Sequence, residues 1–138
     1  MYRIILAEDN PGDVLLFREA LRFSNLACEL IVAEDGEKAL ALLETTGMPG
    51  STSRPDLIVL DVNLPKRSGQ DVLGWVRRHP ILASIPVIVV TSAASPDDKS
   101  KATLLGANLC IQKSSNLDEV FKIGATVQSF LRDKTAEP

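Results

Sequence analysis

Histidine and cysteine are scarce in this chain of 138 residues, which has one histidine and two cysteines. A zinc site needs several such side chains at metal-ligand spacing, and Cys28 and Cys110 stand far apart in the sequence. Two cysteines also give no disulfide framework of the kind that supports a small secreted domain. We therefore expect both cysteines to be reduced and packed as small apolar residues.

Long apolar runs and clusters of basic residues are missing as well. The longest apolar runs have four or five residues, whereas a membrane helix needs roughly 20. The net charge is -3 and the basic residues are scattered, so the chain has no stripe that would neutralise nucleic-acid phosphates. We expect no membrane and no nucleic-acid partner. No signal-peptide pattern follows Met1, so a cytoplasmic location is expected.

Short runs rich in Ile, Val and Leu are present, and they predict buried strands. They lack polar alternation, which is typical of parallel strands covered by helices on both faces. Strands are predicted at 3–7, 29–32, 57–60, 87–90 and 109–112, and helices at 11–23, 37 to about 44, 70–78, 95–106 and 116 to about 131. The fourth helix is expected to begin with Ser95 as its cap, and the polar tail 133–138 is expected to be frayed.

The predicted elements alternate strictly between strand and helix. This order predicts an α/β fold, a doubly wound five-stranded parallel sheet with helices on both faces. A chain of 138 residues suits one compact domain, so we expect one domain over 1–138 with its core at about 3–131.

Groups suited to phosphate chemistry follow four of the five predicted strands. Glu8 and Asp9 follow the first, Asp61 the third, Thr91 the fourth and Lys113 the fifth. Ligands of open α/β sheets bind at this edge. Converging carboxylates resist ionisation unless a cation shares the site, and oxygen ligands of this kind suit Mg²⁺.

A carboxylate beside Mg²⁺ can act as a nucleophile towards a phosphoryl group. Asp61 is the candidate nucleophile, and Thr91 and Lys113 are candidate partners of the phosphoryl oxygens. Each residue alone also has a structural explanation: Glu8 and Asp9 could cap the first helix, and Lys113 could be a surface lysine. The occurrence at four strand ends favours a shared site.

These residues carry a resemblance to a known family. The motifs Glu8-Asp9-Asn10, Asp61-Val62-Asn63-Leu64-Pro65 with Gly69, Thr91-Ser92 and Lys113 resemble those of response-regulator receiver domains, over most of the chain. The resemblance implies the flavodoxin-like strand order 2-1-3-4-5. It further implies that a histidine kinase phosphorylates Asp61, that Glu8, Asp9, Asp61 and the backbone carbonyl of Asn63 hold Mg²⁺, that Thr91 senses the phosphoryl group and that Lys113 pairs with it.

The stretch 8–13 and the long loop before Asp56 resemble more specifically the receivers of cyanobacterial and bacterial phytochrome kinases. Such a protein is expected to catalyse no reaction other than its own phosphorylation and dephosphorylation. With no effector domain after Leu131, output is expected through a phosphorylation-sensitive face of the fourth helix, last strand and last helix, which is also a candidate homodimer face. Apolar residues of that region, taken first as core candidates, are Leu104, Leu105, Ile111 and Phe121.

Two positions depart from the family pattern. Cys110 stands where an aromatic residue usually reports activation, so the usual readout is in question. Ser114 replaces the usual proline after Lys113, so no cis peptide is expected there. His79 is interpreted as a surface residue at a helix end, and Trp75 as a partly packed residue with partner binding as the alternative.

Two other functions remain as alternatives. A phosphatase of the haloacid-dehalogenase type also uses an aspartate nucleophile, but it carries Asp-x-Asp near the chain start, whereas Asn63 stands two residues after Asp61. A receiver-like binding module that no longer takes phosphate is the other alternative, and the presence of Asp61, Thr91 and Lys113 argues against it.

Overall fold

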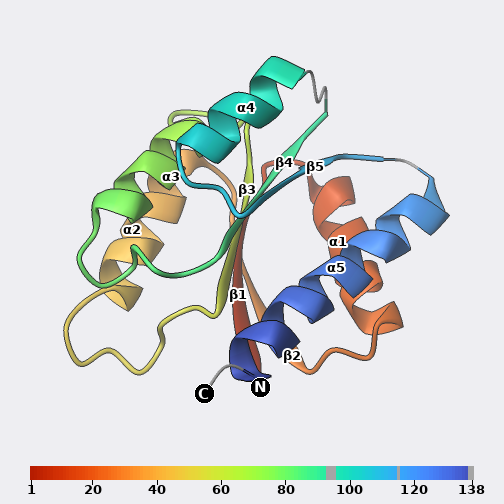
Figure 1. Cartoon of the computed structure of the whole chain (residues 1–138), viewed down its shortest axis with the longest axis horizontal. Coiled ribbons are helices and arrows are strands. Elements are labelled where there is room, and N and C mark those ends of the chain that lie inside the picture. The colour runs from red at the N-terminus through yellow and green to blue at the C-terminus, as the bar shows by residue number, and fades with distance from the viewer. Residues whose placement is uncertain (93–95, 115, 137–138) are drawn as a thin grey trace.

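The computed structural model describes residues 1–92, 96–114 and 116–136 (Figure 1). In these ranges strands and helices alternate along the chain: β1 (Tyr2–Ala7), α1 (Pro11–Phe23), β2 (Cys28–Ala33), α2 (Gly36–Thr46), β3 (Leu57–Asp61), α3 (Gly69–Arg78), β4 (Val87–Thr91), α4 (Pro96–Leu104), β5 (Leu109–Gln112) and α5 (Leu117–Ala136). Neighbouring strands pair in parallel in the order β2-β1-β3-β4-β5. The predicted fold class is confirmed.

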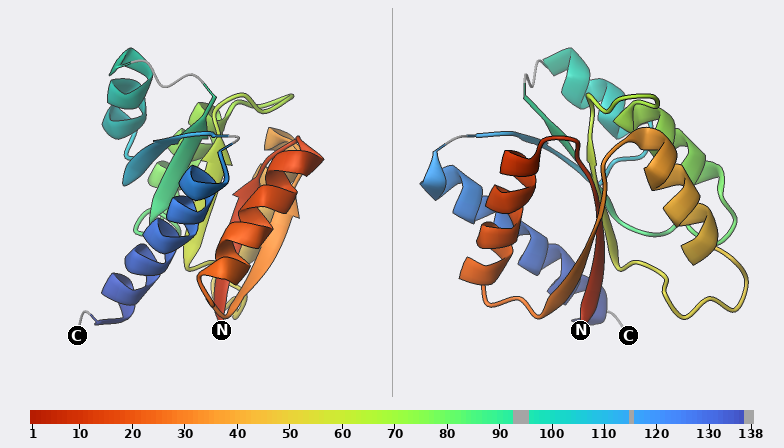
Figure 2. Two further views of the ribbon diagram at one scale, coloured as in Figure 1. Left: turned by 90° about the vertical axis from the view of Figure 1, so that its right-hand side faces the viewer. Right: turned by 180° about the vertical axis from the view of Figure 1, so that it is seen from behind.

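The sheet separates two apolar layers. Figures 1 and 2 show α2, α3 and α4 on one side and α1 and α5 on the other. Successive strand residues point to opposite faces, so Ile5 packs towards the first group and Ile4 towards the second. Both side chains are fully buried, which explains why the strands lack polar alternation.

Side-chain caps begin the three helices that follow β1, β2 and β3. Asn10 Oδ1 accepts a hydrogen bond from Gly12 N at 2.9 Å, and Asp35 Oδ1 accepts one from Lys38 N at 2.8 Å. Ser68 Oγ accepts from Asp71 N at 3.1 Å. Because these caps satisfy the otherwise unpaired N–H groups of a first turn, they fix the loops at the carboxyl edge of the sheet.

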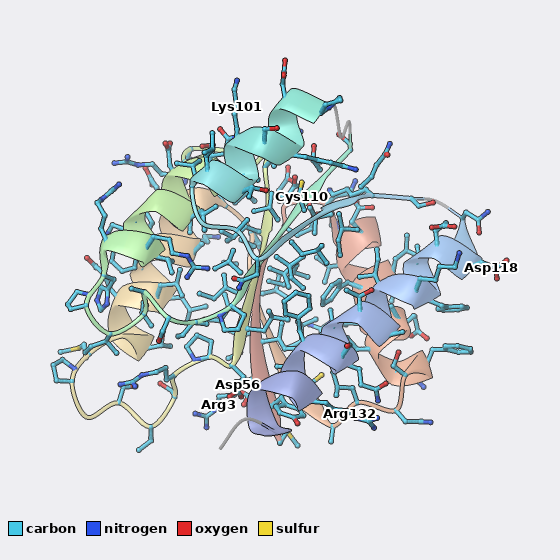
Figure 3. The ribbon with its side chains drawn as sticks, in the orientation of Figure 1. Arg3, Asp56, Lys101, Cys110, Asp118 and Arg132 are labelled. Carbon is cyan, nitrogen blue, oxygen red and sulfur yellow. The ribbon has the colours of Figure 1, made fainter. Side chains whose placement is uncertain are left out.

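A hydrogen-bonded pair of residues joins β1 to the start of β3 at the opposite edge. Arg3 N donates to Asp56 Oδ2 at 2.8 Å, and Asp56 N donates to the Arg3 carbonyl oxygen at 2.8 Å. Figure 3 shows the two side chains close together at the lower end of the sheet. In the same register Leu60 lies opposite Ala7, the last residue of β1, so Asp61 lies one residue beyond the end of β1.

Arg77 of α3 ties that helix to the loop between α4 and β5. Its Nε donates to the Gly106 carbonyl at 2.9 Å, its Nη1 to the Ile85 carbonyl at 2.7 Å and its Nη2 to Asn108 Oδ1 at 2.9 Å. Gly106 has a φ of 104°, a conformation that favours glycine. The C-terminal end of α4 is thereby anchored.

Three expectations need correction, and one lies outside the described residues. The helix α5 continues to Ala136, because the segment after Leu131 contains no helix breaker before Pro138. Leu104 and Leu105 are 86% and 39% exposed rather than part of the core, because α4 turns Ala102 towards the sheet instead. The helix α4 ends at Leu104, two residues earlier than expected. The capping role of Ser95 falls outside the described residues.

Two further features concern the cysteines and the apolar character of the helices. Cys28 and Cys110 are half-buried, each at the margin of one apolar layer. Across the described ranges, no helix combines the length and the apolar character that a bilayer span requires.

A glycine lets α1 and α5 approach closely. A Cβ atom at Gly124 would lie 2.3 Å from the Ala20 carbonyl oxygen and 2.7 Å from Ser24 Oγ. Gln128, one turn further along α5, donates to the Ser24 carbonyl at 2.9 Å. The backbone of α1 therefore leaves no room for a side chain at Gly124.

Gly124→Ala is expected to lower the free energy of unfolding by about 1–3 kcal/mol, because the added methyl group must push the two helices apart. Gly74→Ala is the matched control, since a Cβ there meets only the mobile end of Arg78 at 3.3 Å. That control should change stability by less than about 1 kcal/mol, in the stabilising direction. Urea unfolding measures both, and equal stability of the two variants would contradict the packing argument.

Candidate functional site

Three acidic side chains meet at the carboxyl edge of the sheet. Glu8 follows β1, and Asp61 is the last residue of β3, the neighbouring strand. Both are buried, at 5% and 4% exposure, whereas Asp9 is exposed. One carboxylate oxygen from each lies within 4.8 Å of the others. The structure thus brings together the acids that the sequence placed at two separate strand ends.

The lysine that follows β5 offsets part of the negative charge of this cluster. Lys113 Nζ lies 2.8 Å from Asp61 Oδ2, 2.5 Å from Glu8 Oε1 and 2.8 Å from Asp13 Oδ2. An ammonium group has three N–H donors, and each of them meets a carboxylate here. Hydrogen bonds between charged groups are stronger than neutral ones, so Lys113 is held over Asp61.

Burial and charge set the protonation of the cluster. Burial raises the pKa of the Glu8 carboxyl to about 7, with Lys113 opposing the rise and Asp61 adding to it. Burial also acts to raise the pKa of Asp61, but hydrogen bonds from Lys113, Glu8 and Asn63 outweigh it and hold that pKa below its usual value. The three carboxylates overcome the burial of Lys113 and raise its pKa. Asp61 is therefore ionised at neutral pH.

The backbone around Asp61 is fixed from both sides. Asn63 N donates to Asp61 Oδ1 at 3.0 Å, and Val62 N donates to the Val90 carbonyl at 3.0 Å. A Cβ at Gly69 would lie 2.2 Å from the Asp61 carbonyl oxygen, so glycine allows α3 to begin against the end of β3. The ligand role expected of the Asn63 carbonyl stays a prediction.

Thr91 ends the strand next to Asp61. Asp61 pairs in register with Val90, so Thr91 lies one residue further towards the carboxyl edge. It is buried, and its carbonyl oxygen accepts a hydrogen bond from Lys113 N at 2.7 Å. The backbone of Thr91 thus helps to set where the Lys113 side chain begins.

Comparison with known proteins identifies the family. The sequence profile of the response regulator receiver domain matches residues 4–124. The chain belongs to the response regulator receiver family. Receivers of this family work with histidine kinases and bind a divalent metal ion, and aspartate phosphorylation is their hallmark.

The most similar receivers include phytochrome-linked proteins. Response regulator Rcp1 of Synechocystis sp. is 38% identical over 135 residues, which cover 98% of this chain and 92% of Rcp1. The phosphorylated cyanobacterial phytochrome response regulator RcpA has a TM-score of 0.84 at 38% identity, covering 96% of this chain and 95% of RcpA. The Mn²⁺-bound form of Rcp1 has a TM-score of 0.81 at 39% identity, covering 94% of each chain. The expected similarity to phytochrome receivers is confirmed.

The acidic cluster suits a divalent ion of the kind that receivers bind. Its donor atoms are all oxygens, and two of the three carboxylates are buried. The raised pKa of Glu8 follows from its burial and from the proximity of Asp61, and a hard cation would relieve that repulsion. The residues present therefore fit such an ion.

Asp13 belongs to the cluster although sequence reasoning did not assign it. It lies in the first turn of α1, and its carboxylate shares Lys113 with Asp61. A helix that starts at a strand end places its first turn over the same edge of the sheet. Asp13 is the third acid of the segment 8–13, after Glu8 and Asp9, and this gathering of acids was the signal that could have found it.

The two departures from the receiver pattern are both visible. Cys110 is half-buried on the face of β5 that carries α4 (Figure 3). Among the described residues no peptide bond is cis, as expected for Ser114, whose Oγ accepts a hydrogen bond from Asn116 N at 3.0 Å before α5 begins. Ser114 thus helps to order the start of α5.

His79 lies outside the cluster, as expected, but is half-buried rather than on the surface. It ends α3, and its Nδ1 accepts hydrogen bonds from Ile81 N at 3.1 Å and Leu82 N at 3.2 Å. Its ring centroid is 5.0 Å from that of Trp75. The histidine therefore organises the turn after α3.

Lys113→Met, measured in the presence of a chelator, is expected to lower the free energy of unfolding by about 1–3 kcal/mol, because it leaves buried carboxylates without their cation. The matched control is Lys122→Met on α5, where an exposed lysine pairs with Glu119 at 3.2 Å. Exposed pairs contribute about 1 kcal/mol or less. Urea unfolding compares the two, and equal losses would mean that Lys113 does not stabilise the cluster.

Proposed function

We propose that this receiver accepts a phosphoryl group on Asp61 from a histidine kinase and thereby carries a signal. The observation that supports this is the surroundings of one carboxylate. Asp61 is buried at the end of β3, its Oδ2 is 2.8 Å from Lys113 Nζ, and oxygens of Glu8 and Asp9 lie within 4.8 Å. An ionised nucleophile, a cation and two further oxygen ligands are thus together.

The chemistry asks little of the protein beyond positioning and charge. An oxygen of the Asp61 carboxylate attacks the phosphorus atom of a phosphohistidine, the P–N bond breaks, and the imidazole keeps the electron pair and takes up a proton from solvent. Transfer of this kind is assisted mainly by groups that neutralise the phosphoryl oxygens. Lys113 serves as one such group, and the Thr91 hydroxyl serves as a hydrogen-bond partner that reports the phosphoryl group.

Mg²⁺ is the divalent ion proposed for this site. Glu8, Asp9, Asp61 and the backbone carbonyl of Asn63 would hold it, which gives the oxygen donor set that Mg²⁺ prefers. When bound, the ion supplies positive charge that offsets the acids and the phosphoryl oxygens. Burial of Glu8 and Asp61 strengthens their interaction with a cation, since it reduces screening by water.

A phytochrome-type kinase is the proposed donor. The support is the similarity to Rcp1 and RcpA over nearly the whole of this chain. We take the protein as one receiver domain over 1–138, acting in the cytoplasm, with no nucleic-acid partner and with no catalytic role beyond its own phosphorylation and dephosphorylation.

The face formed by α4, β5 and α5 is the proposed output and homodimer surface. Leu104 of α4 exposes an apolar side chain, which suits a surface that a second receiver could cover. Cys110 lies next to α4, so a thiol rather than an aromatic ring would accompany any movement of Thr91. Phosphorylation would act by shifting the balance between two conformations of this face.

Incubation with Mg²⁺ and a small phosphodonor such as acetyl phosphate should add one labile phosphoryl group, because the cluster around Asp61 binds the ion and stabilises the transferring group. Intact mass measurement detects the addition. Asp61→Asn should abolish it, whereas the control Asp71→Asn, which changes an exposed acid of α3, should retain it. Phosphoryl uptake by Asp61→Asn equal to that of the parent would refute the assignment.

Phosphotransfer from purified kinases tests the proposed donor. A phytochrome-type kinase of the host, first loaded with phosphate on its histidine, should lose the label to this receiver faster than kinases with other sensory domains. Equal or slower transfer from the phytochrome-type kinase would contradict the proposed partner while leaving Asp61 as the acceptor.

Addition of MgCl₂ should raise the midpoint of thermal unfolding, because an ion that binds only the folded state stabilises it by ~2.7 kcal/mol at one hundred times its dissociation constant. Asp9→Asn should lose most of this gain, since it removes one proposed ligand. Asp118→Asn, an exposed acid at the start of α5, should keep it. Scanning calorimetry measures the shifts, and an undiminished gain in Asp9→Asn would contradict the ligand set.

A further inference from the structure

A groove of about 620 Å³ runs between α2 and α3, away from the acidic cluster. The two helices contact each other and lie side by side on the outside of the sheet (Figures 1 and 2). Apolar side chains form its floor, among them Leu40 of α2, the half-buried Trp75 of α3 and the partly exposed Leu105 after α4. None of the residues proposed to bind phosphate or metal lines it.

Each helix presents a regular stripe to this groove. On α2 the lining positions run from Glu37 through Leu40 and Ala41 to Glu44, which is the i, i+3, i+4, i+7 spacing of one helix face. On α3 the lining continues along the helix to Trp75. Two parallel stripes with a furrow between them form the surface against which a third helix packs.

The charged residues on the two walls have opposite signs. Glu37 and Glu44 lie on α2, Arg78 lies on α3, and Arg67 lies in the loop just before α3. The backbone of Arg67 lies against the first turn of α2, because a Cβ at Gly36 would lie 2.0 Å from the Arg67 carbonyl oxygen. The walls are therefore acidic on one side and mainly basic on the other, although Asp71 of α3 also lines the groove.

Among the described residues, these four charges have no ion-pair partner, whereas some other exposed helical charges do. Arg22 pairs with Glu19, and Lys122 pairs with Glu119, each at i, i+3 on its own helix. Glu44, by contrast, has Leu40 four residues before it. The α2 helix itself therefore offers Glu44 no basic partner at this position, and its exposed carboxylate is available to pair with a basic residue of a bound molecule.

We propose that the groove between α2 and α3 binds an amphipathic helix of a partner protein. That helix presents an apolar face to Leu40, Trp75 and Leu105, two basic residues seven positions apart to Glu37 and Glu44, and acidic residues on its other edge to the arginines. The spacing of the basic residues matches that of the acids: Glu37 and Glu44 are seven residues apart, which is about two turns of helix. The interaction does not depend on phosphorylation.

The probe for this proposal is a synthetic, side-chain-crosslinked helical peptide with fluorescent label. It carries leucines on one face, two lysines seven positions apart on one edge and two glutamates on the other. A second peptide has the lysines and glutamates exchanged and so has the same net charge. Fluorescence anisotropy measures affinity, and amide chemical-shift changes locate binding on the full chain.

The first peptide should bind with shift changes confined to α2, α3 and the segment around Leu105. The double variant Glu37→Lys with Glu44→Lys should lower its affinity about tenfold, since two exposed pairs turn from attraction to repulsion. The same variant should bind the exchanged peptide more tightly than the parent protein does. The control Glu19→Lys with Glu119→Lys makes the same change in net charge outside the groove, and it should leave both affinities unchanged.

Several results would overturn the proposal. They are failure of the parent to bind either peptide, equal affinity for both peptides, or shift changes centred on other helices. Sedimentation of the parent protein tests a second copy as the occupant: a dimer that the groove variant abolishes and the control variant keeps would assign the groove to self-association instead of a partner helix.

Discussion

One ammonium group holds three carboxylates together at the edge of this sheet, and the site depends on that balance. Lys113 Nζ lies within hydrogen-bond distance of Glu8, Asp13 and Asp61. Without a cation, acids at this spacing would take up protons, because like charges raise each other's pKa. The pKa of Glu8 is already raised to about 7, by burial first and by Asp61 as well. The cluster is thus poised to exchange one positive partner for another.

The parallel sheet is what makes this gathering possible. The acids come from β1 and β3, which are neighbours in the order β2-β1-β3-β4-β5, and the lysine follows the edge strand β5. Lys113 reaches across β4, where its backbone N–H is held by the Thr91 carbonyl. Residues 52 positions apart therefore meet at 2.8 Å, and the buried apolar strands keep their carboxyl ends level.

Much of this was predictable from the sequence, and the remainder has physical reasons. Apolar strand runs and turn signals fixed the element order, and polar residues at strand ends located Glu8, Asp9, Asp61 and Lys113. Asp13 was not assigned because it sits inside a helix, where an acid near the N-terminus already has a reason to be present. Leu104 was taken as core because hydrophobicity alone does not say which way a short, weakly amphipathic helix turns.

Arg77 attaches α4 to the rest of the molecule at the C-terminal end of that helix. Its guanidinium binds the Gly106 carbonyl and Asn108 just beyond the C-terminal end of α4. Among the described side chains of α4 itself, Ala102 alone is buried, two residues before the helix ends at Leu104. A helix clamped at one end and lightly packed along its length has a defined pivot. Rotation of α4 about that point would swing its first turn while leaving the geometry of β5 intact.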